Sequence, residues 1–120
     1  MSREEIKELS DEGNVIASHT WNHEKVPSYK TQEKWDEQID GPNKKIREIT
    51  GREPAPYFAY PFGLWNKEGI PELKKRGVKA AFILATRRDE NDPLYTIRRM
   101  IASGTWSAKG LYQSMIATFD

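Results

Sequence analysis

Hydrophobic and polar positions alternate between two periods along the chain. Within residues 2–12, apolar side chains recur at helical spacing, and Ser2 and Gly13 stand where an N-cap and a C-terminal stop are expected. The next run, NVIAS (14–18), is short, β-branched and small, which is typical of a buried strand. The chain therefore opens with a helix followed by a strand.

The same alternation continues to the last residues. A second helix is predicted from about Thr31 to Ile49, and Gly41-Pro42 should kink or divide it, because an interior proline costs about 3 kcal/mol. The remaining predicted elements are a strand within 54–63 (PAPYFAYPFG) that ends in a turn, a helix from Asn66 to about Arg76, strands over 79–85 and 95–102, and a helix capped by Ser107 with Leu111, Met115 and Phe119 on one face.

About four helices alternating with about four strands predict an α/β fold with mostly parallel strands. In such folds the loops at the carboxyl ends of the strands converge, and chemistry gathers there. His19, the turn 61–63 and the loop from Arg87 each follow a predicted strand. We expect these three segments to share one rim of the sheet.

Composition narrows the classes of partner. The 120 residues suffice for one modest domain, and the formal net charge of +1 gives no field that would steer the chain to nucleic acid or an anionic membrane. No apolar run approaches the roughly 20 residues that cross a bilayer. The absence of cysteine excludes disulfides and thiolate metal sites, and nothing in the sequence indicates a compartment.

His19 and His23 are the only histidines, and they are four positions apart. If the loop after the strand coils into a helical turn, both imidazoles reach one ion, and zinc suits nitrogen ligands best. Ser18, Thr20 and Asn22 are placed to orient the imidazoles from outside the ligand set. The alternative is a pair of loop histidines hydrogen-bonded to the backbone. The H-E-x-x-H metalloprotease pattern does not fit, because Thr20 occupies the glutamate position.

Longer stretches resemble a known family. The segment GNVIASHTWNH resembles the second motif of the polysaccharide deacetylases, and YFAYPFGLWN resembles their third motif. GVKAAFILA and LYTIRRMIASGTWSAKGL are similar to the ending of one branch, so the resemblance covers nearly all of the chain. These carbohydrate esterases remove acetyl groups from N-acetylglucosamine polymers or from acetylated xylan.

The resemblance implies a metal-dependent hydrolase that removes N-acetyl or O-acetyl groups from a polysaccharide, acting on a non-peptide C–N bond in the first case. His19 and His23 would be two of three protein ligands to zinc or another divalent ion. The backbone N–H of Phe62 would stabilise the oxyanion. Tyr60 and Trp65 would offer ring faces to a sugar, or else be ordinary core or rim aromatics.

The chain also departs from the family pattern. The Thr-Phe-Asp-Asp-Gly motif, which supplies a general base and the third metal ligand, does not occur upstream of His19. The resemblance therefore predicts that residues 1–120 form a single domain, a partial (β/α) barrel of the polysaccharide deacetylase type that lacks its first strands. Thr118-Phe119-Asp120 matches the first three letters of that motif by chance, because Phe119 fits the apolar face of the last helix; a permuted chain is the alternative.

Two further family residues are absent from their usual places. Ala59 stands where the third motif usually carries an arginine. Arg98 or Arg99 could supply that charge from the neighbouring strand end, and Arg99 is the preferred candidate; the alternative is a solvated or ion-paired surface arginine. No histidine follows residue 23, so the general-acid histidine of many members has no counterpart here.

Three hypotheses from different classes follow. The chain is a deacetylase domain or part of one, a catalytically inactive carbohydrate-binding or metal-binding remnant of that fold, or an α/β interaction domain with structural histidines. An unclosed parallel sheet also leaves edges that invite pairing, which predicts a possible homo-oligomer. The partners expected are a polysaccharide and, through these edges, a second copy.

Overall fold

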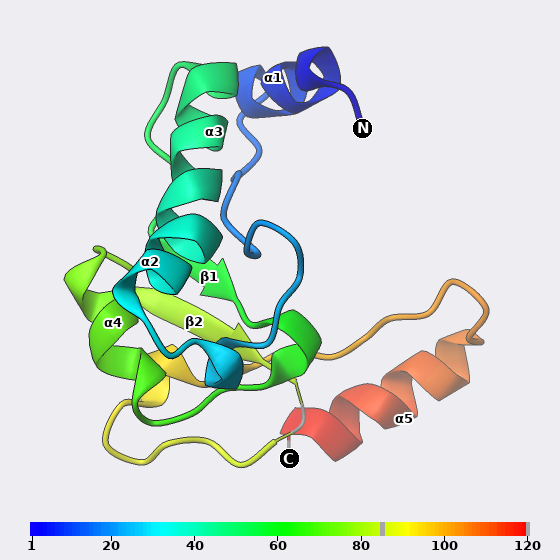
Figure 1. The fold of residues 1–120 in the computed structure, drawn as a ribbon. Coiled ribbons are helices and arrows are strands. Elements are labelled where there is room, and N and C mark those ends of the chain that lie inside the picture. Colours follow the sequence, from blue (N-terminus) through cyan, green and yellow to red (C-terminus); the bar gives the residue numbers. More distant parts are fainter. Residues whose placement is uncertain (85, 120) are drawn as a thin grey trace.

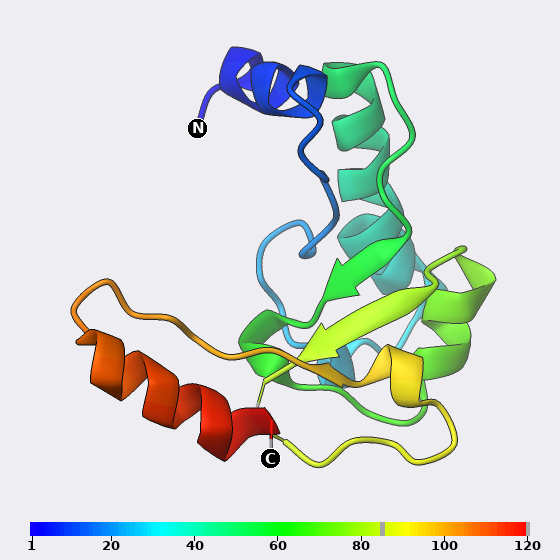
Figure 2. The same ribbon diagram turned by 180° about the vertical axis from the view of Figure 1, so that it is seen from behind.

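Three short parallel strands form the centre of the structure, a computed structural model that describes residues 1–84 and 86–119. The strands lie in the order β1-β2-β3, which agrees with the predicted α/β class. Helices α2, α3 and α4 lie on one side of β1 and β2, as the two opposite views show (Figures 1 and 2). The helices and strands are α1 (Arg3–Asp11), α2 (Gln32–Trp35), α3 (Gly41–Thr50), β1 (Tyr57–Ala59), α4 (Gly69–Lys75), β2 (Ala80–Ile83), β3 (Ile97–Arg98) and α5 (Ala108–Phe119).

Alternation along the strands separates a core face from an open face. Phe58, Ala81 and Ile83 are buried, whereas Tyr57 is 42% exposed and stacks edge-on against Phe82 on the other face, with ring centroids 6.5 Å apart. The period of two along a strand produces this separation. The core cluster consists of Val26, Tyr29, Trp35, Ile39, Phe58, Tyr60, Leu73, Val78, Ala81 and Ile83.

The predicted strand over 14–18 is reduced to a single parallel bridge between Ser18 and Phe58. Two backbone hydrogen bonds hold this segment beside β1, from Ala55 N to the Ile16 carbonyl and from Ala59 N to the Ser18 carbonyl. Val15 is 67% exposed, so burial of its side chain does little to stabilise a longer strand here. The sheet therefore has three strands within the described residues, where the sequence predicted about four.

The C-terminal part departs most from prediction. β3 covers two residues of the predicted strand 95–102, because a 3₁₀ turn over 93–95 precedes it and Ile101 is 61% exposed. None of residues 108–119 is buried, so the predicted apolar face of α5 does not pack into the core. The predicted strand 79–85 is confirmed as β2, although Ala85 lies outside the described residues, as does Asp120 of the segment 118–120. No helix in the described part of the chain is long and apolar enough to cross a bilayer.

Ser2 and Ser107 cap their helices as predicted, whereas Asn66 does not occupy the cap position of α4. The Ser2 hydroxyl accepts a hydrogen bond from Glu5 N at 3.1 Å, and the Glu5 carboxylate accepts one from Ser2 N, which completes a capping box. Asn66 Oδ1 accepts from Gly69 N at 3.2 Å, but α4 begins only at Gly69 and its N-cap position is Glu68, so the helix predicted from Asn66 starts three residues later. Ser107 caps α5 through Gly110 N.

Gly41-Pro42 does not divide the second helix. The helical run continues from Gln32 to Thr50, and residues Asp36–Asp40 widen into a π-helical turn in which Gly41 N donates to the Asp36 carbonyl. Pro42 has no N–H, and its ring would clash with the carbonyl four residues earlier in a regular helix. The wider turn accommodates the proline, so the predicted kink or break is corrected to a local change of helix type.

A largely buried arginine ties this helix to α4. The Arg76 side chain is 7% exposed and donates to Asp36 at 2.6 Å, to Asp40 at 3.1 Å and to Glu72 at 2.5 Å. Asp36 and Asp40 lie on the π-helical turn and Glu72 on α4. One guanidinium therefore clamps two segments about 40 residues apart in sequence.

Gly63 permits a close approach between the turn after β1 and the end of β2. Its φ is +67°, and a Cβ there would lie 2.5 Å from Leu84 N. We expect Gly63→Ala to lower the free energy of unfolding by about 2–4 kcal/mol, because backbone strain adds to overpacking. Gly51→Ala is the matched control, since Gly51 has φ +70° with nothing within 4 Å. Urea unfolding measures both, and equal losses would contradict the close approach.

The Arg76 clamp makes a second stability prediction. Arg76→Met should lower the free energy of unfolding by about 1–3 kcal/mol, a range below that of fully buried pairs because the aspartates remain exposed. Arg47→Met is the control, because Arg47 pairs with Glu53 at 2.6 Å on the surface and its removal should cost less than about 1 kcal/mol. If the two variants lose similar stability in urea, Arg76 does not act as a clamp.

Candidate functional site

The first histidine, His19, directly follows the segment 16–18 and lies beside the end of β1. His19 Nδ1 lies 2.6 Å from the carbonyl oxygen of Ala59. A carbonyl only accepts hydrogen bonds, so Nδ1 carries the proton and Nε2 keeps its lone pair. This arrangement, with one ring nitrogen fixed by a backbone carbonyl and the other available, is typical of imidazoles that bind metals.

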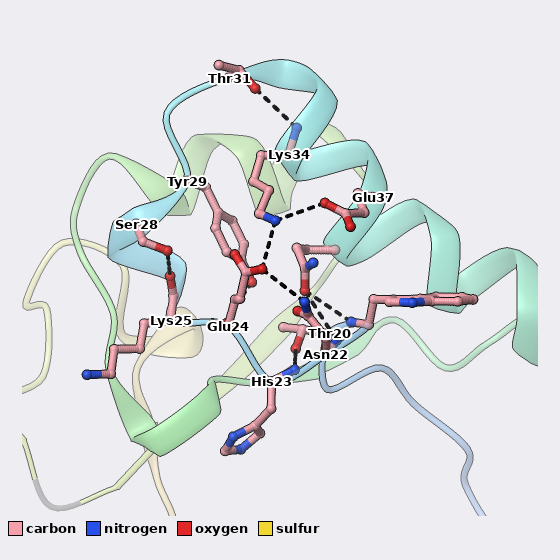
Figure 3. A network of polar contacts seen from close by, with 12 residues as sticks. Thr20, Asn22, His23, Glu24, Lys25, Ser28, Tyr29, Thr31, Lys34 and Glu37 are labelled. Atoms are coloured by element: carbon pink, nitrogen blue, oxygen red, sulfur yellow. Dashed lines mark hydrogen bonds and ion pairs between the residues drawn. The ribbon is translucent and has the colours of Figure 1, made fainter.

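The second histidine is brought back to the first by an irregular loop, not by the predicted helical turn. Thr20 and His23 both have left-handed backbones, with φ of 72° and 65°. The Thr20 hydroxyl accepts a hydrogen bond from His23 N at 3.0 Å, as Figure 3 shows. The two imidazole centroids are 4.8 Å apart and their planes cross at 64°. The rings therefore lie together as expected, but by a different backbone route.

The left-handed residues need support from outside the loop, because such conformations cost about 1–3 kcal/mol each in non-glycine residues. Gln38, on the π-helical turn, is fully buried, and its Oε1 accepts from Trp21 N at 3.3 Å and from Asn22 N at 3.4 Å. Sequence reasoning missed this residue. The available signal was a polar side chain at an inward-facing helical position beside Ile39.

Ser18, Thr20 and Asn22 act on the loop rather than on the imidazoles. Ser18 Oγ accepts from Thr20 N at 3.4 Å, and Asn22 Nδ2 donates to Glu24 at 2.9 Å. The expected orientation of the rings by these side chains is therefore corrected. They stabilise the backbone that carries the rings.

An ion-pair network lies on the helix side of the loop (Figure 3). Lys34 Nζ is 2.8 Å from Glu24 and 2.9 Å from Glu37. The Lys34 ammonium is the main cause that lowers the pKa of the Glu24 carboxyl. The Tyr29 hydroxyl donates to the Glu24 carbonyl at 2.9 Å, and burial raises the pKa of Tyr29 to about 12. The network joins the loop to α2 through Lys34, and the lowered pKa of Glu24 favours its ionised form in this pair.

Phe62 forms the wall opposite the histidine loop. It follows β1 within the turn Pro61–Gly63, has φ 56°, and its ring centroid is 4.4 Å from that of His23. Its side chain is 52% exposed. The role of its backbone N–H as oxyanion donor stays a prediction.

Arg99, the preferred arginine, lies at the same rim, whereas Arg98 does not. Arg99 Nη2 donates to the Tyr60 carbonyl at 3.1 Å, and Arg98 reaches Thr118 on α5. The pKa of His19 is lowered, chiefly by partial desolvation of its ring, against the opposing Ala59 hydrogen bond, with His23 and Arg99 adding to the decrease. The shift favours the neutral imidazole that metal coordination requires.

The two aromatic residues expected at a sugar site, Tyr60 and Trp65, differ in their exposure to solvent. Tyr60 is fully buried in the core and offers no ring face to solvent, so the alternative of a core aromatic is the one observed. Burial raises its pKa, and its hydroxyl has no partner among the described residues. Trp65 is half-buried and lines a cavity of about 310 Å³ with residues 87–91, so its contact with sugar stays a prediction. The loop from Arg87 lies there, against Trp65.

The pair of imidazoles fits a divalent metal as two of its ligands. Two imidazoles beside one another offer the nitrogen donors that zinc prefers, and the tautomer of His19 leaves its Nε2 with a lone pair. Among the described residues, no group of three His, Cys, Asp or Glu side chains is close enough to hold an ion. Metal binding by His19 and His23 therefore stays a prediction.

Comparison with known proteins bears on this arrangement. The family model described as polysaccharide deacetylase matches residues 1–81. The peptidoglycan-N-acetylmuramic acid deacetylase of Bacillus subtilis (strain 168) is 30% identical over 77 residues, which are 64% of this chain and 29% of that protein. A polysaccharide deacetylase structure from Bacillus cereus matches with a TM-score of 0.74 and 25% identity, covering 96% of this chain and 36% of that chain.

A Streptococcus pyogenes deacetylase in complex with acetate has a TM-score of 0.76 at 17% identity, over 96% of this chain and 50% of that one, and this likeness shows the fold alone. The chain thus spans half the length of these relatives or less. The predicted partial barrel is confirmed by these neighbours and by the open parallel sheet. With the family model matching residues 1–81, the chain belongs to the polysaccharide deacetylase family.

Proposed function

We propose that this chain is part of a metal-dependent polysaccharide deacetylase, a hydrolase that removes N-acetyl or O-acetyl groups from a polysaccharide. The observation that carries the proposal is that the His19 and His23 rings lie 4.8 Å apart, with the His23 ring 4.4 Å from the Phe62 ring in the turn after β1. Family membership supports the reaction class. The isolated stretch of 120 residues is proposed to hold the metal and to lack the complete acid–base machinery.

His19 and His23 would hold zinc or another divalent ion. When bound, such an ion polarises the acetyl carbonyl and lowers the pKa of a water molecule. The Ala59 carbonyl keeps the proton of His19 on Nδ1 and so presents Nε2. The Phe62 N–H is proposed to donate to the oxyanion, an interaction typically worth about 3–4 kcal/mol in the transition state.

Other groups of the chain have supporting roles in the proposal. Arg99, fixed on the Tyr60 carbonyl, would contribute positive charge near His19. Trp65 would offer its ring to a sugar in the cavity beside residues 87–91. The general base and the third ligand are proposed to be an aspartate pair supplied from outside residues 1–120 or by a partner chain, since no adjacent aspartates occur upstream of His19.

A second candidate is an inactive metal-binding or carbohydrate-binding remnant of the same fold. The observation that favours it is that the described residues contain no cluster of three metal-ligating side chains. The third candidate, an interaction domain with structural histidines, differs from both others in binding no metal.

The metal site makes the first functional prediction. His19→Ala and His23→Ala should each remove stoichiometric zinc, because either change halves the nitrogen donors of the pair. Elemental analysis after dialysis measures the content, and Glu4→Ala on the exposed face of α1 is a control that should keep it. Equal zinc in the wild type and both histidine variants would exclude this metal site.

The second functional prediction concerns the aspartate pair that the chain is proposed to lack. The 120-residue chain should release no acetate from chitooligosaccharides, whereas a chain joined to the aspartate-bearing segment of a relative should do so. Robust turnover by the 120 residues alone would refute the proposed need for added carboxylates. A joined chain that binds zinc and remains inactive would favour the remnant.

A further inference from the structure

We propose that Gln38 is a positioning residue for the histidine loop, and that it acts only as a hydrogen-bond acceptor. This inference rests on the proposed function where it concerns metal affinity, because the loop is taken to carry the ligands. Gln38 touches neither imidazole among the hydrogen bonds of the described residues. Its effect on the site would therefore pass through the backbone of residues 21 and 22.

The first step is the geometry of the loop. Thr20 and His23, which flank Trp21 and Asn22, both have left-handed φ values, so the loop does not hold this shape by intrinsic preference. The hydroxyls of Ser18 and Thr20 supply bonds from within the same stretch of chain. Gln38 supplies two bonds from a separate element, 17 and 16 residues away in sequence.

The second step is the chemistry of the amide. Two N–H donors converge on Oε1, and only an oxygen can accept both, so the orientation of the side chain is determined. Nε2 is buried and has no acceptor within the described residues. The position therefore uses one end of the amide, and a carboxyl group of the same length keeps an acceptor oxygen in the same place.

The third step is the rigidity of the support. Gln38 lies in the π-helical turn between Asp36 and Asp40, and Arg76 bonds to both of these aspartates. The side chain is fully buried beside Ile39 in the core. A change at Gln38 should thus be transmitted to the loop and not absorbed by movement of the helix.

The experiment compares Gln38→Leu with Gln38→Glu. Removal of the acceptor leaves two N–H groups without a partner, so Gln38→Leu should weaken zinc binding about 10- to 100-fold, the range typical of lost outer-shell contacts. Gln38→Glu should stay within about 3-fold of the wild type. Chelator competition measures the affinity, and the visible spectrum of the cobalt-loaded chain should change in the leucine variant and be restored in the glutamate variant.

Gln32→Leu is the matched control, because Gln32 is an exposed glutamine on the same helical run and bonds to Arg76 instead of the loop. It should leave zinc affinity unchanged. Circular dichroism establishes whether each variant is folded. If Gln38→Leu does not fold, Gln38→Asn withdraws the acceptor by one methylene and should show the same loss in milder form.

Amide hydrogen exchange at Trp21 and Asn22 provides a readout that needs no metal. Exchange should accelerate at least about 10-fold in Gln38→Leu or Gln38→Asn and keep the wild-type rate in Gln38→Glu. Unchanged exchange with unchanged zinc affinity would overturn the inference while leaving the proposed function intact. A wild type that binds no zinc would defeat the proposed function, and the exchange rates would still decide the role of Gln38.

Discussion

The parallel alignment of residues 16–18 with β1 is the constraint on which the site depends. Two backbone hydrogen bonds, at Ala55 and Ala59, fix it. Because both segments run in the same direction, the residue after one and the turn after the other emerge at the same end. His19 can then reach the Ala59 carbonyl, and His23 can reach Phe62. No side chain could compensate for a shift of this alignment by one residue, since every inward group would turn outward.

The site is built from weak supports that come from different elements. A strand carbonyl sets the proton of His19, a turn after β1 supplies the Phe62 wall, and a helix supplies the acceptor for the loop. Each bond alone is worth about 1 kcal/mol. Together they fix a loop whose backbone would otherwise relax. The stability of the core and the geometry of the histidines are therefore linked through the helix that carries Gln38 and meets Arg76.

Sequence patterns predicted features governed by local chemistry. Ser2 and Ser107 cap helices because a short polar side chain satisfies free N–H groups, whatever the remainder of the fold does. The extent of strands depended on neighbours, which local patterns do not report, so the segment 14–18 was overestimated. The left-handed backbone of His23 had only a weak local signal, because histidine is enriched in this region but still adopts it uncommonly. Gln38 was visible as a polar residue on an apolar face, but its partners were not.

The two left-handed positions of the histidine loop, Thr20 and His23, limit which residues can be substituted there. Glycine is the residue that would relieve such a backbone. At Thr20 it would delete the hydroxyl that receives His23 N, and at position 23 it would delete an imidazole. Substitution by glycine, which would relieve the backbone strain, would therefore remove a functional group at both positions. In homologous loops of this shape, positions 20 and 23 should tolerate substitution far less readily than the other exposed positions. The loop keeps its shape through contacts with the surrounding elements, so substitutions elsewhere in it should be tolerated.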